Sequence, residues 1–163
     1  MKEITGKVLK LGDNVDTTQI IPRQYHNTTS VTKLAKHLLE EYGNGFPAKI
    51  RGGEILVAGS HFGSGPTSLQ TALALKAGGI SCIVAKSFDR SFFRSGINHG
   101  LPLVVADIVD KVKDGDEIAI DLGQGTITYP GGEDGFPPYP EFILSIVHTG
   151  DLITAVKKKL EKV

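Results

Sequence analysis

Two short apolar runs, separated by a glycine-rich turn and a helical pattern, constrain the fold of this chain most. Residues 54–59 and 81–86 are apolar almost throughout, as in parallel strands whose two faces are both buried. Between them, residues 67–77 carry apolar side chains at helical spacing and are followed by Gly78 and Gly79. Because a crossover between parallel strands is right-handed, the sequence predicts a βαβ unit within an α/β fold.

The rest of the sequence predicts further elements around this unit. We expect strands over 5–11, 101–106, 118–122 and 126–129, and helices over 31–42, 88–98, 141–149 and 152–161. Ser30 and Ser87 are the expected N-caps of two of these helices. The Gly- and Pro-rich stretch 130–140 is expected to be a surface loop. Together these elements predict a single α/β domain over 1–163, with a mixed sheet of parallel βα units and a β-hairpin.

Charge and cysteine content exclude several classes of protein. Eighteen basic and eighteen acidic residues balance, so the chain lacks the basic excess that binds nucleic acid or anionic membranes. No stretch approaches a membrane span or a signal core, which predicts a cytoplasmic protein. The single cysteine, Cys82, lies in an apolar run and is expected to fill the core. We therefore expect no metal ligands and no bound cofactor in this chain.

The turn His61-Phe62-Gly63-Ser64-Gly65-Pro66-Thr67-Ser68 is the first candidate site. Glycine permits the sharp turn, and Pro66 suits the first position of a helix. Free amides of the first helical turn stabilise a carboxylate or phosphate there. The spacing matches neither a P-loop nor a dinucleotide fingerprint. The alternative is a glycine-rich βα turn that binds nothing.

Several motifs along the chain resemble one family. They are Gly12-Asp13-Asn14-Val15-Asp16-Thr17, Ile20-Ile21-Pro22, Gly63-Ser64-Gly65, Ala85-Lys86-Ser87-Phe88, Arg94, Asn98-x-Gly100-Leu101-Pro102-Leu103 and Pro140-Glu141-Phe142. This set is similar to the small subunits of the 3-isopropylmalate dehydratase and homoaconitase group, which correspond to the mobile domain of aconitase. The resemblance covers the whole chain.

The resemblance implies a fold, a partner and a reaction. The fold is a swivelling β/β/α domain that closes over a large partner subunit. That partner carries a [4Fe–4S] cluster, which acts as a Lewis acid in removing and re-adding water on a hydroxy diacid or triacid. The resemblance thus implies a hydro-lyase subunit of the leucine-biosynthesis type that recognises a small carboxylate substrate and is active only with its large subunit.

The chain departs from the family pattern at positions that carry the chemistry. The family reads G-C-G-S-S-R-E where this chain reads Gly63 to Leu69, so the serine that acts as base is Pro66 and the carboxylate-binding arginine is Ser68. The family's D-T-D motif ends here in Thr18 instead of a second aspartate. Proline has no group that can take a proton, and the substrate-selecting segment around Asn27 matches neither usual family form.

The candidate site residues follow from this alignment and from the turn. Thr67 or Ser64 is the candidate catalytic hydroxyl, although Ser64 could instead cap the following helix. The candidate substrate-binding residues are Thr17, Thr18, His26, Asn27, Gly63, Gly65 and Ser68. His26 could be a proton donor or a carboxylate partner, since histidine can fill either role. His61 stands where the family usually has asparagine and is expected to pack beside the turn.

Three functions remain open at this point. The chain is a dehydratase subunit for isopropylmalate or for a different hydroxy acid, or a binding or regulatory relative that kept the fold and lost this half of the chemistry. The third candidate is a stand-alone phosphate-binding domain, which depends on the glycine turn alone.

Overall fold

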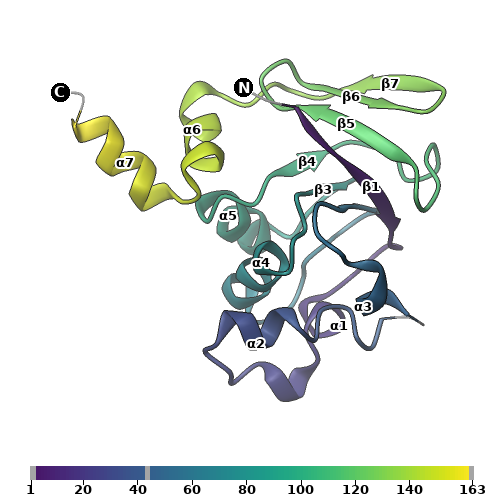
Figure 1. The fold of residues 1–163 in the computed structure, drawn as a ribbon, viewed down its shortest axis with the longest axis vertical. Coiled ribbons are helices and arrows are strands. Elements are labelled where there is room, and N and C mark those ends of the chain that lie inside the picture. The colour runs from purple at the N-terminus through teal and green to yellow at the C-terminus, as the bar shows by residue number, and fades with distance from the viewer. Residues whose placement is uncertain (1–2, 43–44, 162–163) are drawn as a thin grey trace.

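The computed structural model describes residues 3–42 and 45–161, which form a seven-stranded mixed sheet with helices against it (Figure 1). The strand order is β4-β3-β2-β1-β5-β6-β7. The strands are β1 (Ile4–Lys10), β2 (Ile55–Ala58), β3 (Cys82–Ala85), β4 (Leu103–Val105), β5 (Glu117–Asp121), β6 (Thr126–Tyr129) and β7 (Gly132–Gly135). The helices are α1 (Thr17–Ile20), α2 (Val31–Ala35), α3 (Phe46–Lys49), α4 (Ser68–Ala77), α5 (Arg90–Asn98), α6 (Glu141–Thr149) and α7 (Leu152–Glu161), with a 3-10 turn η1 (Arg23–Tyr25).

Strand β1 joins a parallel half of the sheet to an antiparallel half. Its end pairs in parallel with β2, with Val8 opposite Ile55, and its start pairs antiparallel with β5, with Ile4 opposite Ile120. β2, β3 and β4 continue in parallel, whereas β5, β6 and β7 continue as antiparallel neighbours. The predicted combination of parallel βα units and a β-hairpin in one mixed sheet is therefore confirmed.

Every residue of β2 and β3 is buried, as expected for strands covered on both faces. Alternate side chains enter two different cores. Leu56 and Ile83 belong to a core shared with the helices, whereas Val57 and Val84 belong to a second core. Cys82 lies fully buried in that second core, and its burial raises the pKa of its thiol, so the prediction that it fills the core is confirmed.

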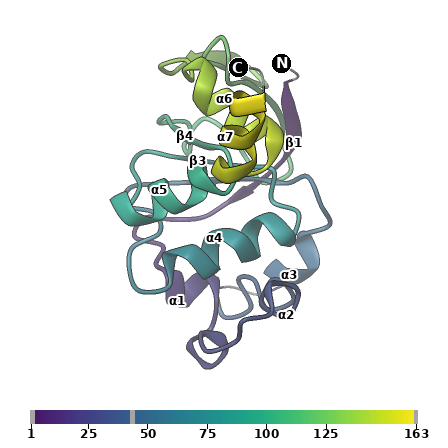
Figure 2. The same ribbon diagram turned by 90° about the vertical axis from the view of Figure 1, so that its left-hand side faces the viewer.

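The antiparallel half of the sheet covers the second core. Ile118 and Ile120 of β5 and Ile127 of β6 pack there against Val8 and Val104 of the parallel half. Two β layers and one helical layer result, and in Figure 1 β5 to β7 lie above β3 and β4 while α4 and α5 lie below them. On the other face, α4 lies between α2 and α5, and α6 contacts both α5 and α7 (Figure 2). Among the described residues, no helix is long and apolar enough to cross a membrane.

The helix predicted over 31–42 is wrong beyond Ala35. Ser30 caps α2 as expected, its Oγ accepting from the Lys33 amide at 3.3 Å, but the following residues form turns. Leu39 adopts a left-handed φ of 56°, and its amide donates to the Ile20 carbonyl at 2.8 Å. This tertiary hydrogen bond takes the place of a helical one at Leu39, whose side chain is fully buried.

Two further predictions are wrong at element boundaries. Ser87 does not cap α5, which begins at Arg90 with the Asp89 carboxylate accepting from the amides of Ser91 and Phe92. The loop predicted over 130–140 contains β7, whose residues have low strand propensity but pair with β6. Pairing across the hairpin, which no local pattern records, decides that element.

Candidate functional site

Three chain segments meet where β1, β2 and β3 end in parallel. The loop 59–67, which follows β2, lies between the loop 11–16 after β1 and the segment 86–89 after β3. On one side the Thr17 amide donates to the Ser64 carbonyl at 2.8 Å, and on the other the Asp89 amide donates to the Phe62 carbonyl at 2.8 Å. Short β-bridges join Asp16 to Ser64 and Phe62 to Phe88. Ligands of open α/β sheets bind at this carboxyl edge, so the predicted turn occupies a favourable place.

Glycine is required in the loop because neighbouring groups approach the backbone closely. A Cβ on Gly63 would overlap the Phe92 ring, and a Cβ on Gly65 would lie 2.8 Å from Thr17 Oγ1. Both glycines also have positive φ, of 91° and 109°. The expectation that glycine permits a sharp turn here is confirmed, with close packing as a second reason.

The start of α4 differs from the prediction. Pro66 precedes the helix instead of occupying its first position, and Thr67 is the N-cap, in a left-handed conformation with φ 63°. The Thr67 side chain makes no capping hydrogen bond, and among the described residues Ser64 makes none to this helix either. For the backbone amides of Ser68, Leu69 and Gln70, the described residues provide no acceptor. These amides can bind an anion, whereas the Gly63 amide is already bonded to the Val15 carbonyl at 2.7 Å.

The threonines around the turn make hydrogen bonds within the protein. Thr17 is fully buried and its hydroxyl donates to the Pro66 carbonyl, to which the Thr67 hydroxyl also donates at 2.6 Å. The Thr18 hydroxyl donates to the Asp16 carboxylate at 2.6 Å. The same carboxylate caps α1 by accepting from the Gln19 amide. In this arrangement Thr17 and Thr67 hold the turn. The side chains of Ser64 and Ser68 have no hydrogen-bond partner within the described part of the chain.

The structure does not join His26 and Asn27 to the turn. His26 Nε2 donates to the Ile21 carbonyl at 2.7 Å, and Asn27 is exposed. Among residues 3–42 and 45–161, no hydrogen bond or ring contact connects either residue to residues 59–68. His61 is exposed at φ 60°, and its amide donates to Ser87 Oγ at 2.8 Å. Asparagine and histidine both tolerate this conformation, which explains why His61 fits here.

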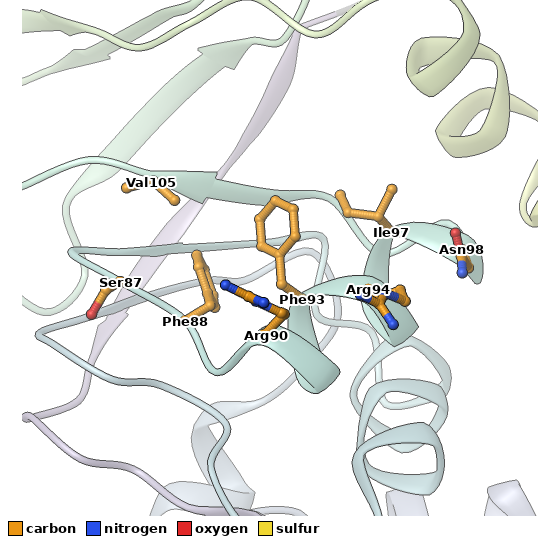
Figure 3. Close-up of a pocket in the computed structure, with 8 residues that line it drawn as sticks. All are labelled: Ser87, Phe88, Arg90, Phe93, Arg94, Ile97, Asn98 and Val105. Atoms are coloured by element: carbon orange, nitrogen blue, oxygen red, sulfur yellow. The ribbon is translucent and has the colours of Figure 1, made fainter.

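Sequence reasoning missed two supports of the site and an adjacent groove. The Asp13 carboxylate accepts from the Ser60 amide at 2.7 Å and fills the space beside Gly59. Asp89 orients α5 beneath the loop. The signal for both was present, since each aspartate stands where a strand ends and a turn or helix begins. The groove is lined by Ser87, Phe88, Arg90, Phe93, Arg94, Ile97, Asn98 and Val105 (Figure 3).

The residues of this chain do not fit an iron–sulfur cluster. Such clusters are held by several cysteine thiolates, and Cys82, the only cysteine, is buried in the second core. In the described part of the chain, no three His, Cys, Asp or Glu side chains are placed to hold a metal ion.

Comparison with known proteins agrees with this geometry. The chain matches the aconitase C-terminal domain over residues 2–107. It is 43% identical to a 3-isopropylmalate dehydratase small subunit of Nautilia profundicola, with 99% of both chains covered. It is 45% identical to a protein of the same name from Caldicellulosiruptor bescii, with 96% of both covered.

A solved structure extends this likeness to the fold. The crystal structure of a 3-isopropylmalate dehydratase, LeuD, from Methanocaldococcus jannaschii superimposes with a TM-score of 0.88 at 36% identity. The match covers 98% of this chain and 96% of that one. The aconitase-type fold expected from the sequence motifs is thereby confirmed. The chain belongs to the family of 3-isopropylmalate dehydratase small subunits, within the group that shares the aconitase C-terminal domain.

Proposed function

We propose that this chain is the small subunit of a 3-isopropylmalate dehydratase-type hydro-lyase and acts with a large subunit that holds a [4Fe–4S] cluster. The observation that carries the proposal is that relatives with this name are 40 to 45% identical to the chain over nearly its full length. A small subunit implies a larger one, and a chain with one buried cysteine needs a partner to supply the cluster.

In this proposal the chain binds and orients substrate. The free amides of Ser68, Leu69 and Gln70 donate to a substrate carboxylate at the start of α4, with the Ser68 hydroxyl in support. Thr17 holds the turn in place through the hydrogen bond from its hydroxyl to the Pro66 carbonyl. The partner's cluster supplies the Lewis acid when both subunits are assembled.

Proton transfer is the role in which this chain differs from the family pattern. Pro66 occupies the aligned base position and cannot take a proton. Thr67 and Ser64 are the proposed substitutes, and of the two the Ser64 hydroxyl is the one without an acceptor in the described residues. A hydroxyl base needs nearby positive charge, which the α4 amides or the partner would provide.

The expected charge of the substrate follows from the absence of the family's arginine at position 68. An arginine binds a carboxylate through two charge-assisted hydrogen bonds, and Ser68 replaces it here. Without compensation this loss weakens substrate binding by about 1.5–3 kcal/mol, or roughly ten- to a hundredfold. We therefore expect a substrate that is less anionic than a tricarboxylate, or one that the large subunit holds more completely.

The test is reconstitution with the large subunit from the same genome. The pair is assayed on 2-isopropylmalate, citramalate and homocitrate, and we expect hydration or dehydration of the first or second and little activity on homocitrate. A second preparation carries Pro66→Ser, Ser68→Arg and Thr18→Asp together. An assembled pair that is inactive as wild type and active with these substitutions would identify a binding or regulatory relative and contradict the proposal. Wild-type activity on homocitrate equal to that of an ordinary family member would show the loop to be misaligned.

The anion site has its own test. A crystal soaked in sulfate or malonate should show density within hydrogen-bond distance of the Ser68 and Leu69 amides. A Ser68→Asp variant, whose carboxylate occupies the same helix end, should lose that density. Density absent from the wild-type crystal at saturating malonate would assign a purely structural role to the turn.

A further inference from the structure

An open groove of about 590 Å³ runs between α5 and the edge strand β4 (Figure 3). Its floor is apolar. Phe93 rises from α5 toward β4, and Val105 of β4 is 50% exposed. Phe88 and Ile97 complete this floor.

Two arginines stand along the same groove without a partner. Arg90 and Arg94 are exposed and lie one turn apart on α5, and within residues 3–42 and 45–161 neither makes an ion pair or hydrogen bond. Like charges at this spacing repel and weaken a helix slightly. The nearby Asp89 carboxylate is already bonded to the Ser91 and Phe92 amides, and the groove itself contains no acidic residue. The groove therefore fits a ligand that presents both a carboxylate and an apolar side chain.

The groove shares a wall with the candidate site. Ser87, at one end of it, accepts from the His61 amide, and Phe88 pairs with Phe62 by a β-bridge and a T-shaped ring contact of 5.9 Å between centroids. A stable interface covers about 800 Å² on each partner. A large subunit whose cluster reaches residues 63–68 must therefore cover the surface next to them as well.

We infer that the large subunit docks a segment with acidic and apolar side chains in this groove, its carboxylates on Arg90 and Arg94 and its apolar side chain on Phe93 and Val105. This inference rests on the proposed function, because it takes the large subunit as the occupant. A second copy of this chain fits poorly, since a two-fold contact would bring the same two arginines of each copy together. A free metabolite fits less well, because small-molecule sites enclose most of their ligand and this groove is open.

The test measures binding of the purified large subunit to charge-reversed variants. We expect Arg90→Glu with Arg94→Glu to weaken the complex by a hundredfold or more, because both attractive pairs become repulsive. The matched control is Lys157→Glu with Lys158→Glu, the same change in charge on the exposed surface of α7, which should leave the Kd within threefold. Val105→Asp tests the apolar floor and should also weaken the complex. Unchanged thermal unfolding of each variant alone confirms that it folds.

The outcomes separate this inference from the proposed function. An active wild-type pair whose Kd is unaffected by the arginine reversal overturns the groove assignment and leaves the proposed function standing. A wild-type chain that binds no large subunit overturns both. A chain that dimerises alone, with the dimer dissociated by the arginine reversal, assigns the groove to a second copy. Saturable binding of 2-isopropylmalate to the isolated chain, abolished by the same reversal, assigns it to a metabolite.

Discussion

At the scale of single residues, the candidate site depends on small side chains that let other groups approach. Gly63 lies against the Phe92 ring, and Gly59 lies against the Asp13 carboxylate that holds the Ser60 amide. Thr17 reaches the Pro66 carbonyl across the space that Gly65 leaves. The loop 59–67 is thus shaped mainly by contacts with the segment after β1 and with α5, and less by hydrogen bonds within the loop.

We predict that Gly63→Ala destabilises the protein by about 2–4 kcal/mol. A positive φ costs an alanine about 1 kcal/mol, and the overlap of its Cβ with the Phe92 ring adds roughly 1–3 kcal/mol of overpacking. The matched control is Gly131→Ala, which has nearly the same φ, 93°, but open space around its Cβ, and should cost about 1 kcal/mol. Urea unfolding monitored by circular dichroism measures both. Equal losses in the two variants would show that conformation alone, without packing, requires Gly63.

At the scale of elements, Lys76 joins the ends of α5 and α6 to α4, in addition to the apolar contacts that α6 makes with the cores. Lys76, in the last turn of α4, donates from Nζ to the carbonyls of His99 and Gly150 at 2.8 and 2.6 Å. These two residues are the C-caps of α5 and α6. Three helix C-termini, each with partial negative charge, therefore meet around one ammonium group.

We predict that Lys76→Met loosens α6 and α7 relative to the sheet. Because Lys76 is exposed, solvent offsets part of the loss, and we expect about 1 kcal/mol in the free energy of unfolding. Hydrogen exchange measured by mass spectrometry should become faster in residues 141–161 and stay unchanged in β2 and β3. Lys158→Met, an exposed change on α7 itself, is the control and should leave exchange unaltered. No difference between the two variants would assign the attachment of α6 to its apolar contacts.

The hairpin of β6 and β7 is closed by a cluster of three side chains. Asp134 accepts from Lys111 Nζ at 2.8 Å and from the Tyr129 hydroxyl at 2.9 Å. The hydrogen bond from Lys111, followed by that from Tyr129, holds the pKa of the Asp134 carboxyl below its ordinary value. This cluster ties the low-propensity strand β7 to the segment that follows β4.

The pH dependence of stability should report this cluster. A carboxyl whose pKa is lowered on folding contributes stability above its unfolded pKa, near 3.8, and that contribution disappears as the pH falls through the folded value. Asp134→Asn should therefore lower the unfolding midpoint at pH 7, and the difference from wild type should shrink below about pH 4. Asp110→Asn, an exposed change that removes the same charge, should shift the midpoint less. A wild-type minus Asp134→Asn difference that is constant from pH 7 to 3 would contradict the assignment.

At the scale of the whole molecule, two cores lie on either side of β2 and β3 and stabilise the chain. The helical core lies beneath the candidate site, and the second core is closed by the antiparallel strands. The turn at the carboxyl edge is thus held on a rigid support.

We predict that the chain purified alone contains no iron and catalyses no dehydration. Its one thiol, Cys82, is buried, and burial keeps the thiol protonated, so several thiolates cannot gather around iron. Iron analysis and visible absorption, together with an assay on 2-isopropylmalate, check this outcome. The large subunit serves as the positive control for iron. Substantial activity in the isolated chain would exclude the two-subunit interpretation.

The sequence by itself determined the elements whose signals are local and strong. Unbroken apolar runs specified β2 and β3, Gly78 marked the end of α4, and a turn between alternating segments specified the hairpin of β5 and β6. These features depend on side-chain burial and backbone freedom, which residue type alone largely sets. The family followed for the same reason, since its motifs are short and contiguous.

Only the tertiary structure decided where distant segments compete for the same hydrogen bonds. Leu39 leaves a helical pattern because its amide finds the Ile20 carbonyl. Ser87 does not cap α5, and its Oγ accepts from the His61 amide instead. The strand β7 forms because its backbone groups pair with those of β6. For Leu39 and Ser87 a partner many residues away satisfies a polar group at least as well as the local alternative, and for β7 the partner strand lies across a short turn. The residue types along the chain do not record these pairings.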